Sequence, residues 1–276
     1  MAEDGTQTRS EIRRLLAEHG HRPTKTYGQN FLADRNVVRR MVDVADVDHN
    51  SKVVEIGAGT GTLTTELAGR CGLVVAYEID HSLAPVLEET IGGFDNVELR
   101  FGDASKAHLG KELGEGRWTM VANLPYNVGT GIILDALQQA AGIERIVAMV
   151  QSELADRLLA DAGTKTYGLP SVTAGLHAVG RRAFSAPPQV FEPEPRVESA
   201  VIVLDRIDAP PSAPRAIELA AAAFNQRRKM LRRSLAETLT DTEKTLERAG
   251  IDPTTRPEQL SPLDFASIAD AEGDQQ

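Results

Sequence analysis

The chain has 276 residues, of which 41% are hydrophobic and 25% charged, a composition typical of a folded globular protein with one or two domains. No apolar run approaches the ~18 residues that cross a membrane, and the acidic start lacks an apolar core. We therefore expect no membrane span, no secretory signal peptide and a cytoplasmic location. The net charge of −10 argues mildly against a nucleic-acid partner, and the single cysteine, Cys71, excludes an intramolecular disulfide and a cysteine-based metal cluster.

Strand and helix patterns alternate after an N-terminal tail and short helix, which we assign to residues 1–21. Apolar runs predict strands at 52–56, 73–77, 97–101, 118–122 and 143–150, and helical spacing predicts helices at 10–18, 60–69, 128–140 and 152–160. This alternation is typical of a parallel, doubly wound α/β sheet of the Rossmann-like type. Two further apolar segments, 183–184 and 200–204, predict a hairpin at the sheet edge.

A proline-rich break at 208–214 separates this α/β region from an alanine-rich helical pattern at 217–239 and shorter helical segments up to residue 268. We therefore predict an α/β domain over 22–207 and a small, all-helical C-terminal domain over 212–276. No internal repeat is present.

A glycine-rich turn follows the first strand, in the segment Glu55–Gly61. Glycines at the start of a helix let the backbone approach a ligand closely. Glu78 ends the next strand, where a carboxylate accepts hydrogen bonds from both hydroxyls of a ribose. Asp103 ends the third strand and is placed to accept a hydrogen bond from an adenine amino group. Glu55, Glu78 and Asp103 are expected to line one crevice at the carboxyl edge of the sheet.

The most discriminating motif is Asn123-Leu124-Pro125-Tyr126, directly after the fourth strand. Adenine N6 is a poor nucleophile because its lone pair is delocalised into the ring, so attack on a sulfonium methyl requires acceptors that draw the nitrogen toward tetrahedral geometry. The Asn123 side-chain oxygen and the Leu124 carbonyl suit this role, and Pro125 makes the turn rigid. Tyr126 is expected to stack on the extracted base through its ring face, which makes its phenol oxygen dispensable.

These motifs resemble those of the ribosomal RNA adenine N6,N6-dimethyltransferase family (KsgA type) over residues 22–268. The matching segments are, in order, Gly28–Leu32, Glu55–Gly61, Glu78–Asp80, Gly102–Ala104, Asn123–Tyr126, Gln151–Arg157, Phe191–Ser199 and Arg227–Lys229. Ala58 and Thr60 stand where relatives often carry proline and leucine. The resemblance implies that residues 22–207 form an S-adenosylmethionine-binding catalytic domain and that 212–276 contact RNA.

The resemblance also implies the reaction and its residues. It indicates dimethylation of N6 in two adjacent adenosines of the 3′-terminal hairpin of small-subunit (16S) rRNA, with S-adenosylhomocysteine as product and no metal. The substrate would be an assembling small ribosomal subunit, and we expect a monomer. The residues implied to contact the cofactor are Asn30, Leu32, Gly57, Glu78, Asp103 and Asn123. Tyr126 and Phe191 are implied to sandwich the target adenine, although a single phenylalanine such as Phe191 is often a packing residue. Gln29 and Asn30 would offer amides to the methionine end.

RNA contact is expected at a basic run made up of Arg227, Arg228, Lys229, Arg232 and Arg233. On a helix around Phe224 these side chains would lie on faces adjoining an apolar stripe. A charge run is commonly a solvated face, but in an acidic chain with a base-modifying site it indicates phosphate binding. Arg196 is a further phosphate candidate, and Arg181 with Arg182 would extend the basic surface.

Four alternatives stay open. Resistance methyltransferases that modify one adenosine of large-subunit rRNA share the fold, but often carry an isoleucine form of the Asn123–Tyr126 motif. DNA adenine methylases typically carry Asn-Pro-Pro-Tyr or Asp-Pro-Pro-Tyr. A non-catalytic rRNA-binding assembly factor is disfavoured by the intact Asn123, Tyr126 and Glu78. A nicotinamide oxidoreductase is disfavoured by the glycine spacing, which departs from Gly-x-Gly-x-x-Gly.

Overall fold

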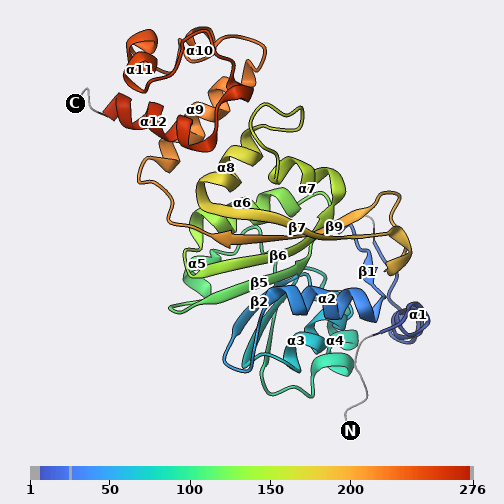
Figure 1. Cartoon of the computed structure of the whole chain (residues 1–276). Coiled ribbons are helices and arrows are strands. Elements are labelled where there is room, and N and C mark those ends of the chain that lie inside the picture. Colours follow the sequence, from blue (N-terminus) through green and yellow to red (C-terminus); the bar gives the residue numbers. More distant parts are fainter. Residues whose placement is uncertain (1–6, 25–26, 274–276) are drawn as a thin grey trace. The chain divides into compact units, whose positions relative to one another are not determined.

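The computed structural model describes residues 7–24 and 27–273, and their contacts group into two compact units (Figure 1). The N-terminal unit comprises residues up to Ala155 together with Arg181–Asp205, and the C-terminal unit comprises Asp156–Gly180 together with the residues from Arg206 onward. Residues 1–6 of the expected N-terminal tail lie outside the described residues. None of the described helices is both long and apolar enough to span a membrane.

The N-terminal unit contains the α/β elements of the chain. Its helices are α1 (Arg9–Glu18), α2 (Arg35–Ala45), α3 (Thr62–Ala68), η1 (His81–Leu83), α4 (Ala84–Ile91), α5 (Leu109–Glu112), α6 (Gly129–Gln139) and η2 (Pro188–Val190). Its strands are β1 (Phe31–Leu32), β2 (Lys52–Ile56), β3 (Leu73–Glu78), β4 (Val97–Phe101), β5 (Trp118–Asn123), β6 (Ile143–Gln151), β8 (Phe191–Glu192) and β9 (Ser199–Arg206). Helix α7 (Ser152–Leu158) and strand β7 (Ala178–Ala186) each cross from one unit to the other, and the last residue of β9, Arg206, already belongs to the C-terminal unit.

The main sheet has seven strands in the order β4-β3-β2-β5-β6-β9-β7. Strands β4 to β6 are parallel, and β9 is antiparallel to β6. The five predicted parallel strands and the Rossmann-like fold class are confirmed, and the two segments expected as an edge hairpin lie in the neighbouring strands β7 and β9. A separate two-stranded sheet pairs β1 with β8, where Leu32 lies opposite Phe191.

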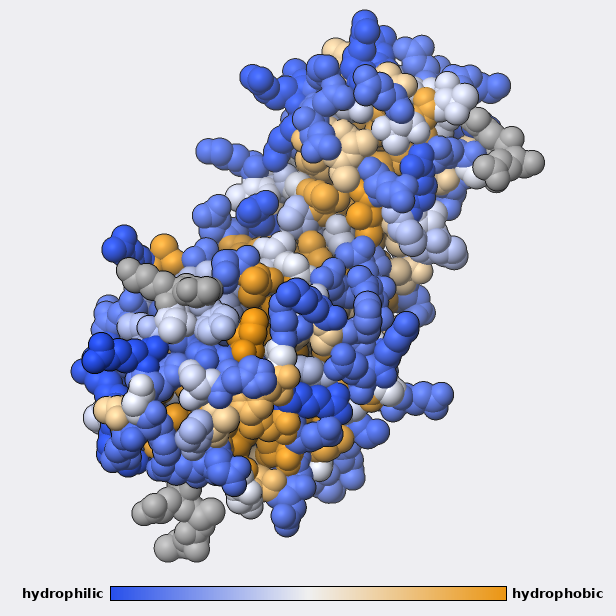
Figure 2. Space-filling model, turned by 180° about the vertical axis from the view of Figure 1, so that it is seen from behind, coloured by the Kyte–Doolittle hydropathy of each residue, from blue (hydrophilic) through white to orange (hydrophobic). Residues whose placement is uncertain are grey.

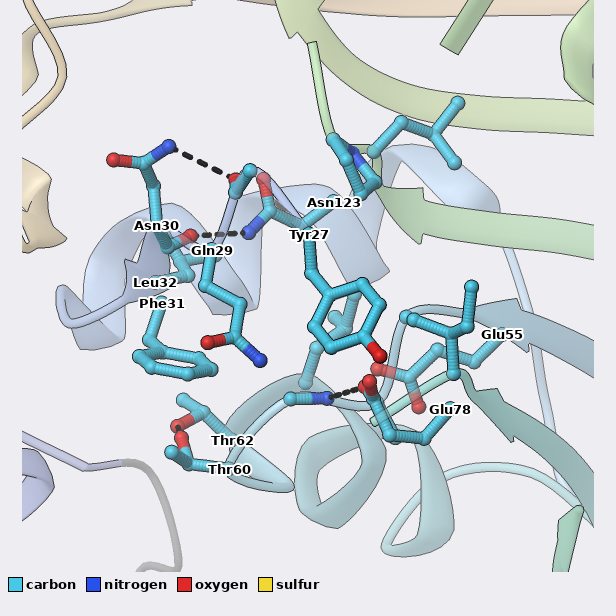
Figure 3. Close-up of a pocket in the computed structure, with 18 of the residues that line it drawn as sticks. Tyr27, Gln29, Asn30, Phe31, Leu32, Glu55, Thr60, Thr62, Glu78 and Asn123 are labelled. Carbon is cyan, nitrogen blue, oxygen red and sulfur yellow. Dashed lines mark hydrogen bonds between the residues drawn. The ribbon is translucent and has the colours of Figure 1, made fainter. Parts of the chain in front are cut away.

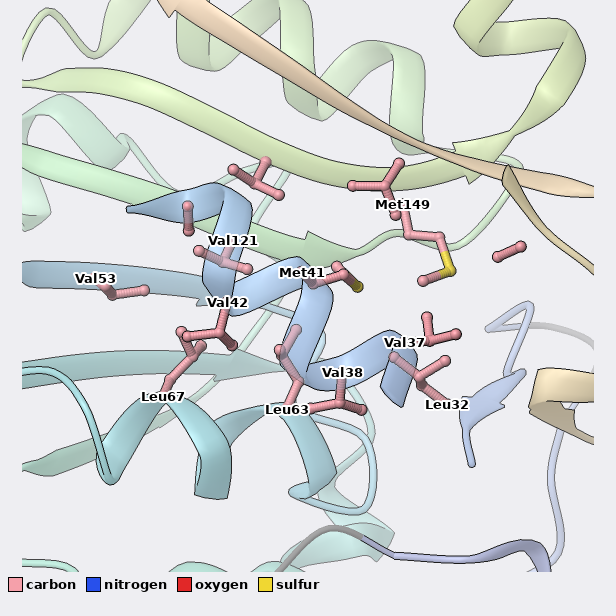
Figure 4. Packing of buried hydrophobic residues seen from close by; sticks show 14 of the residues in the cluster. Leu32, Val37, Val38, Met41, Val42, Val53, Leu63, Leu67, Val121 and Met149 are labelled. Atoms are coloured by element: carbon pink, nitrogen blue, oxygen red, sulfur yellow. The ribbon is translucent and has the colours of Figure 1, made fainter. Parts of the chain in front are cut away.

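Helices cover the sheet from both sides, with α2 and α3 against one face and α5 and α6 against the other (Figure 1). The apolar face of α2 packs in the cluster that Figure 4 shows, where Met41 lies on the side of Val121 and Met149, and Val38 lies on the side of Leu63 of α3. Helix α2 begins where the Asp34 carboxylate accepts hydrogen bonds from two backbone amides of the first turn, at 2.9 and 3.0 Å. Such a cap contributes about 1 kcal/mol to stability, so it fixes the residue at which α2 begins.

The C-terminal unit is built from α8 (Leu169–His177), α9 (Ala213–Asn225), α10 (Leu231–Ser234), α11 (Thr242–Arg248), η3 (Pro257–Gln259) and α12 (Pro262–Gly273). Its core gathers aliphatic side chains of these helices around Tyr167 and Phe265, both almost fully buried. On the face that Figure 2 shows, this unit, in the upper part, has hydrophilic residues along its rim and an apolar region between them. The Tyr167 hydroxyl donates to the Leu260 carbonyl at 2.7 Å, which satisfies this buried polar group.

The single long helix expected over 217–239 is wrong, because the chain leaves α9 after Asn225 and starts α10 at Leu231. Met230 between them is extended. The backbone amides of Leu231 and Arg232 donate to the carbonyls of Thr255 and Pro253, at 2.8 and 3.1 Å, instead of continuing a helical ladder. A segment distant in sequence thus provides the acceptors that make this break favourable.

The division into units also differs in one respect from a boundary near residue 208 alone. The chain does pass into the C-terminal unit at Arg206, close to that boundary, but Asp156–Gly180 also belongs to that unit. Helix α8 packs with α9 and α12 through apolar residues such as Val172 and Leu176. The C-terminal unit is therefore made from two separate stretches of the chain.

A buried acid lies at the carboxyl end of the central strand. Glu55 in β2 is fully buried between Ala76 of β3 and Val121 of β5, and among the described residues neither carboxylate oxygen has a hydrogen-bond partner. Burial raises the pKa of Glu55 from 4.5 to about 8; the Thr64 hydroxyl opposes this rise, and the Glu78 carboxylate adds a smaller contribution to it. In the ligand-free protein this side chain therefore holds a proton at neutral pH.

This proton makes stability depend on pH in a defined direction. Between pH 4.5 and about 8 the folded state binds one proton at Glu55 that the unfolded state has lost, so the free energy of unfolding falls as pH rises. We expect Glu55→Gln to remove this loss. The stability advantage of the variant over the parent should grow from pH 5 to pH 8 by up to ~1.4 kcal/mol per pH unit, measured by urea unfolding of ligand-free protein. The exposed Glu115→Gln is the control. A pH-independent difference at Glu55 would contradict the prediction.

Candidate active site

A pocket of the N-terminal unit opens at the carboxyl ends of β2, β3 and β5 (Figure 3). Strands β2 and β5 are neighbours, but the chain continues from β2 toward β3 and β4 and from β5 toward β6, away on the other side. Such a switch point leaves a crevice between the loops that follow the two strands. The pocket spans about 690 Å³ including open solvent, and the loops after β2 and β5 line it together with Tyr27, Gly28, Gln29, Asn30, Phe31, Leu32, Glu78 and Ile79.

The loop after β2 is shaped by glycines with left-handed backbone angles. Gly59 has φ +58°, and a Cβ there would lie 3.0 Å from the Phe31 ring. Gly61 has φ +83° and caps α3, and a Cβ there would lie 2.6 Å from the Thr90 hydroxyl. Only glycine fits these positions without displacing its neighbours. The loop consequently stays thin and presents its backbone to the pocket.

Glu78, at the end of β3, is nearly buried and held by backbone amides. One carboxylate oxygen accepts from the Gly59 amide at 2.8 Å, and the other accepts from the Asp80 amide at 2.9 Å. Burial raises the pKa of Glu78, and these two hydrogen bonds oppose that rise. Because a carboxylate has about four acceptor positions, each oxygen keeps capacity for one further donor. The geometry suits a ligand with two adjacent hydroxyl groups.

The turn after β5 is held in place by bonds to two other segments. The Asn123 side-chain nitrogen donates to the Asn30 carbonyl at 3.0 Å, which leaves the amide oxygen as the acceptor of that side chain (Figure 3). The Leu124 amide donates to the Met149 carbonyl of β6 at 3.1 Å. The Pro125 carbonyl accepts the amides that begin α6, at 3.2 and 3.1 Å. The turn is therefore fixed on both sides, and its residues Asn123, Leu124 and Pro125 line the pocket.

Two N-terminal segments brace the pocket. The Gln29 side chain donates to the Asp80 carboxylate at 2.7 Å and accepts from the Thr24 amide at 2.7 Å, so both ends of its amide have a partner within the chain. The expectation that it also offers its amide to a ligand stays a prediction. Gln7, almost buried, donates to the Thr60 carbonyl of the glycine loop at 2.8 Å. Both contacts tie the start of the chain to the loops of the pocket.

The structure brings most of the predicted catalytic and cofactor-binding residues together. Asn30, Leu32, Gly57, Glu78, Asn123, Leu124, Pro125 and Tyr126 all line this pocket. The sequence reasoning gave no role to Tyr27, Thr60, Thr62 or Ile79, which also line it. Thr60 lies within the glycine-rich turn and Ile79 directly follows Glu78. This proximity to recognised motifs is the sequence feature that could have identified them as pocket residues.

Asp103 is not among the described pocket residues. Its carboxylate instead accepts from the Ser105 amide at 3.0 Å and hydroxyl at 2.6 Å, and it pairs with Lys106 at 3.3 Å. The hydrogen bond from the Ser105 hydroxyl is the main cause that lowers the pKa of Asp103. The expectation that three strand-end acids line one crevice therefore holds for Glu55 and Glu78, and Asp103 faces its own loop.

Phe191 also lies away from the pocket. Its side chain is fully buried in the hydrophobic cluster of the main sheet, and its backbone pairs with Leu32. In this arrangement the ring has no open face for a base, so the sandwich of an adenine between Phe191 and Tyr126 is not formed. Phe191 acts here as a packing residue that fixes β8 to β1. Arg196, in the loop that follows, is exposed.

The basic run occupies the turn between α9 and α10 rather than one helix. Arg227 donates to the carbonyls of Tyr167 and Thr164, at 2.7 and 3.3 Å, so it braces a neighbouring loop of its own unit. Arg232 is 3.7 Å from Glu243. Arg228, Lys229 and Arg233 are exposed. These three side chains are the ones whose position suits contact with an anionic partner.

No group of three or more histidine, cysteine or carboxylate side chains is arranged to hold a metal ion within residues 7–24 and 27–273. Cys71 is buried, and burial raises its pKa to about 11, which is unfavourable for a nucleophilic thiolate.

Comparison with known proteins relates the whole chain to one group. The protein called "Ribosomal RNA small subunit methyltransferase A" from Kineococcus radiotolerans is 43% identical over 267 residues, which cover 94% of this chain and 89% of the relative. The protein of the same name from Geobacillus thermodenitrificans is 39% identical, with 96% of each chain covered.

Solved structures agree on the fold. A 23S rRNA methyltransferase, ErmE, aligns with a TM-score of 0.69 and 26% identity over 88% of this chain and all of that one. A dimethyladenosine transferase from Plasmodium falciparum aligns with a TM-score of 0.73 and 20% identity, over 86% of this chain and 95% of that one.

The family described as ribosomal RNA adenine dimethylase matches residues 20–272, which is nearly the whole chain. The match includes the glycine loop, Glu78 and the Asn123–Tyr126 turn that form the pocket. The chain therefore belongs to the ribosomal RNA adenine dimethylase family.

Proposed function

We propose that this protein transfers methyl groups from S-adenosylmethionine to N6 of two adjacent adenosines in the 3′-terminal hairpin of small-subunit (16S) rRNA. The enzyme acts as a cytoplasmic monomer on an assembling small ribosomal subunit. The observation that carries the proposal is the position of the Asn123–Tyr126 turn beside Glu78 in one pocket, with the Asn123 amide oriented by Asn30. Family membership supports the same reaction.

The residues of the pocket fit this cofactor. Glu78 offers one acceptor on each oxygen to the two ribose hydroxyls. Glu55 is a buried acid without a hydrogen-bond partner among the described residues, and a cationic ligand nearby would favour its charged form. The glycine loop, including Gly57, allows close approach, and Asn30 and Leu32 border the same space. Asp103 would contact the adenine of the cofactor through its second carboxylate oxygen, which Ser105 does not bond.

The turn after β5 supplies the chemistry of the target amine. When bound, S-adenosylmethionine provides an electrophilic methyl group on a sulfonium sulfur. The Asn123 side-chain oxygen and the Leu124 carbonyl accept the two N–H bonds of adenine N6, which draws the nitrogen lone pair out of the ring and toward the methyl carbon. The sulfonium would supply the methyl group and leave as S-adenosylhomocysteine, and the proton from N6 would pass to water. Tyr126 stacks on the extracted base.

RNA binding rests on the exposed part of the basic run. Arg228, Lys229 and Arg233 are placed to meet phosphates without losing a partner in the described structure. Arg227 and Arg232 already contact groups of their own unit, and Arg196 is a separate exposed cation.

Methylation of one adenosine in large-subunit rRNA is the second candidate, and the 26% identical ErmE structure is the observation that favours it. The higher identity to proteins named as small-subunit methyltransferases favours the first. Incubating the protein with labelled S-adenosylmethionine and undermethylated small or large subunits, then mapping the label, decides between them. Label on adjacent adenosines of 16S rRNA supports our proposal, and label confined to large-subunit rRNA contradicts it.

We expect Glu78→Ala to weaken S-adenosylmethionine binding, because hydrogen bonds to a charged acceptor are worth ~1.5–3 kcal/mol. Isothermal titration calorimetry measures the cofactor affinity, and a filter-binding assay with rRNA serves as the control, which should be unchanged. A parallel titration with NAD should show no binding to either protein. If the variant binds S-adenosylmethionine as tightly as the parent, Glu78 does not belong to the cofactor site.

We expect Asn123→Ala to slow single-turnover methyl transfer by ~10²–10³-fold at saturating S-adenosylmethionine, because it removes one preorganised acceptor that acts mainly in the transition state. Affinity for rRNA should be nearly unchanged. Asn123→Asp keeps an acceptor oxygen and should retain more activity than the alanine variant. A parental rate for Asn123→Ala would show that amine activation does not depend on this side chain.

We expect Arg228→Ala with Arg233→Ala to lower rRNA affinity and to flatten its dependence on salt by ~0.7–0.9 in log–log slope for each phosphate that is no longer neutralised. Lys244→Ala with Arg248→Ala, which removes two exposed cations from α11, is the charge-matched control. Equal effects of the two pairs would mean that only total charge matters and that the basic run is a solvated surface.

A further inference from the structure

The phenol group of Tyr126 has a specific partner. Its hydroxyl lies 2.8 Å from the hydroxyl of Ser199, the first residue of β9 and a fully buried side chain. Tyr126 itself is partly buried and lines the pocket. The bond joins the turn after β5 to a residue 73 positions further along the chain. The sequence predicts that only the ring face of Tyr126 contacts the base, which leaves the phenol oxygen without a role. In the structure this oxygen has a hydrogen-bond partner in a fixed position.

Both partners are held by the same strand. Leu124, two residues before Tyr126, donates its backbone amide to Met149 of β6. Ser199 lies opposite Gln151 of β6 in the antiparallel ladder. The attachment points on β6 are thus only two residues apart, and the regular geometry of a strand fixes the distance between them. The relative position of the two hydroxyl groups is therefore set by the main sheet and not by a mobile loop.

The bond fixes the ring as well as the hydroxyl. A tyrosine ring turns about two side-chain bonds, and a hydrogen bond at its far end restricts both. If the ring turned away, the Ser199 hydroxyl would be left buried without this partner, and an unsatisfied buried hydroxyl costs about 1–3 kcal/mol. The Tyr126 ring is consequently held in one orientation before any base arrives.

This orientation matters more for the second methyl group than for the first. An unmodified adenine amine has two N–H bonds, and the Asn123 oxygen and Leu124 carbonyl can hold both. After one transfer the amine keeps a single N–H bond, so only one of these acceptors still holds it. The placement of the monomethylated base then depends more heavily on the stacking surface beneath it.

We propose that Ser199 is a positioning residue for methyl transfer, which acts through its hydrogen bond to Tyr126 and chiefly promotes the step from N6-methyladenosine to N6,N6-dimethyladenosine. This inference rests on the proposed function and assigns a role to the Tyr126 phenol oxygen. Ser199 does not touch the substrate, so it contributes by restricting the orientation of the Tyr126 ring.

The test compares Ser199→Ala, Tyr126→Phe and the double variant with the parent. Single-turnover reactions on undermethylated small subunits at saturating S-adenosylmethionine are followed by mass spectrometry of unmodified, monomethyl and dimethyl adenosine. Each single variant should slow the second transfer about two- to ten-fold, as expected for one hydrogen bond of ordinary net strength, and the first transfer less. At equal consumption of unmodified adenosine, monomethyl product should accumulate. The double variant should match the single variants, because both remove the same bond.

Thr173→Val is the control for loss of a buried hydroxyl outside the site, since Thr173 is buried in α8 and its hydroxyl donates within that helix, to the Leu169 carbonyl at 3.0 Å. It should leave the product ratio at the parental value. A parental ratio in Ser199→Ala, additive effects in the double variant, or a shifted ratio in Thr173→Val would each overturn the inference. Should Ser199→Ala fail to fold, Tyr126→Phe removes the same bond and decides alone. If the parent makes no dimethyladenosine, the proposed function fails instead.

Discussion

The pairing of β2 with β3 on one side and β5 on the other is the constraint on which the rest of the structure depends. Because all three strands run in parallel, their carboxyl ends meet at one edge of the sheet, and because the chain departs from β2 and β5 in opposite directions, no crossover covers the gap between them. The glycine loop and the Asn123–Tyr126 turn flank this gap. The Glu78 carboxylate and the Asn123 amide, which are distant in sequence, line the same pocket because the sheet itself brings the ends of their strands together.

Hydrogen bonds between distant segments then give the pocket its detailed shape. Glu78 is aimed by the Gly59 and Asp80 amides, and Asn123 by the Asn30 carbonyl. Each bond contributes only about 0.5–1.5 kcal/mol net, so no single one determines whether the chain folds. Their effect is to restrict the orientation of polar groups that the sheet has already brought together. Preorganisation of this kind lowers the cost of binding a ligand and of reaching a transition state.

The parallel strands and the pocket motifs were predictable from sequence because their signals are local: an apolar run followed by glycine, an acid or an Asn-Leu-Pro-Tyr turn. Contacts between remote segments were not. The burial of Phe191 depends on β8 pairing with β1, and the break after α9 depends on carbonyls near Thr255. The partner of Tyr126 is a serine within a motif already recognised, but nothing in the spacing of that motif indicates which hydroxyl it meets.

The discontinuous make-up of the C-terminal unit has a consequence during protein synthesis. Helix α8 leaves the ribosome well before α9 and α12, the helices that bury its apolar residues Val172 and Leu176. For the intervening period those side chains lack their native cover, which exposes the nascent chain to non-native association. A shortened protein ending near residue 207 would make that condition permanent, so isolating the N-terminal unit requires removal of Asp156–Gly180 with a short linker in its place. Helices α9 and α12, which are synthesised last, are thus needed to cover the apolar face of α8, which is synthesised much earlier.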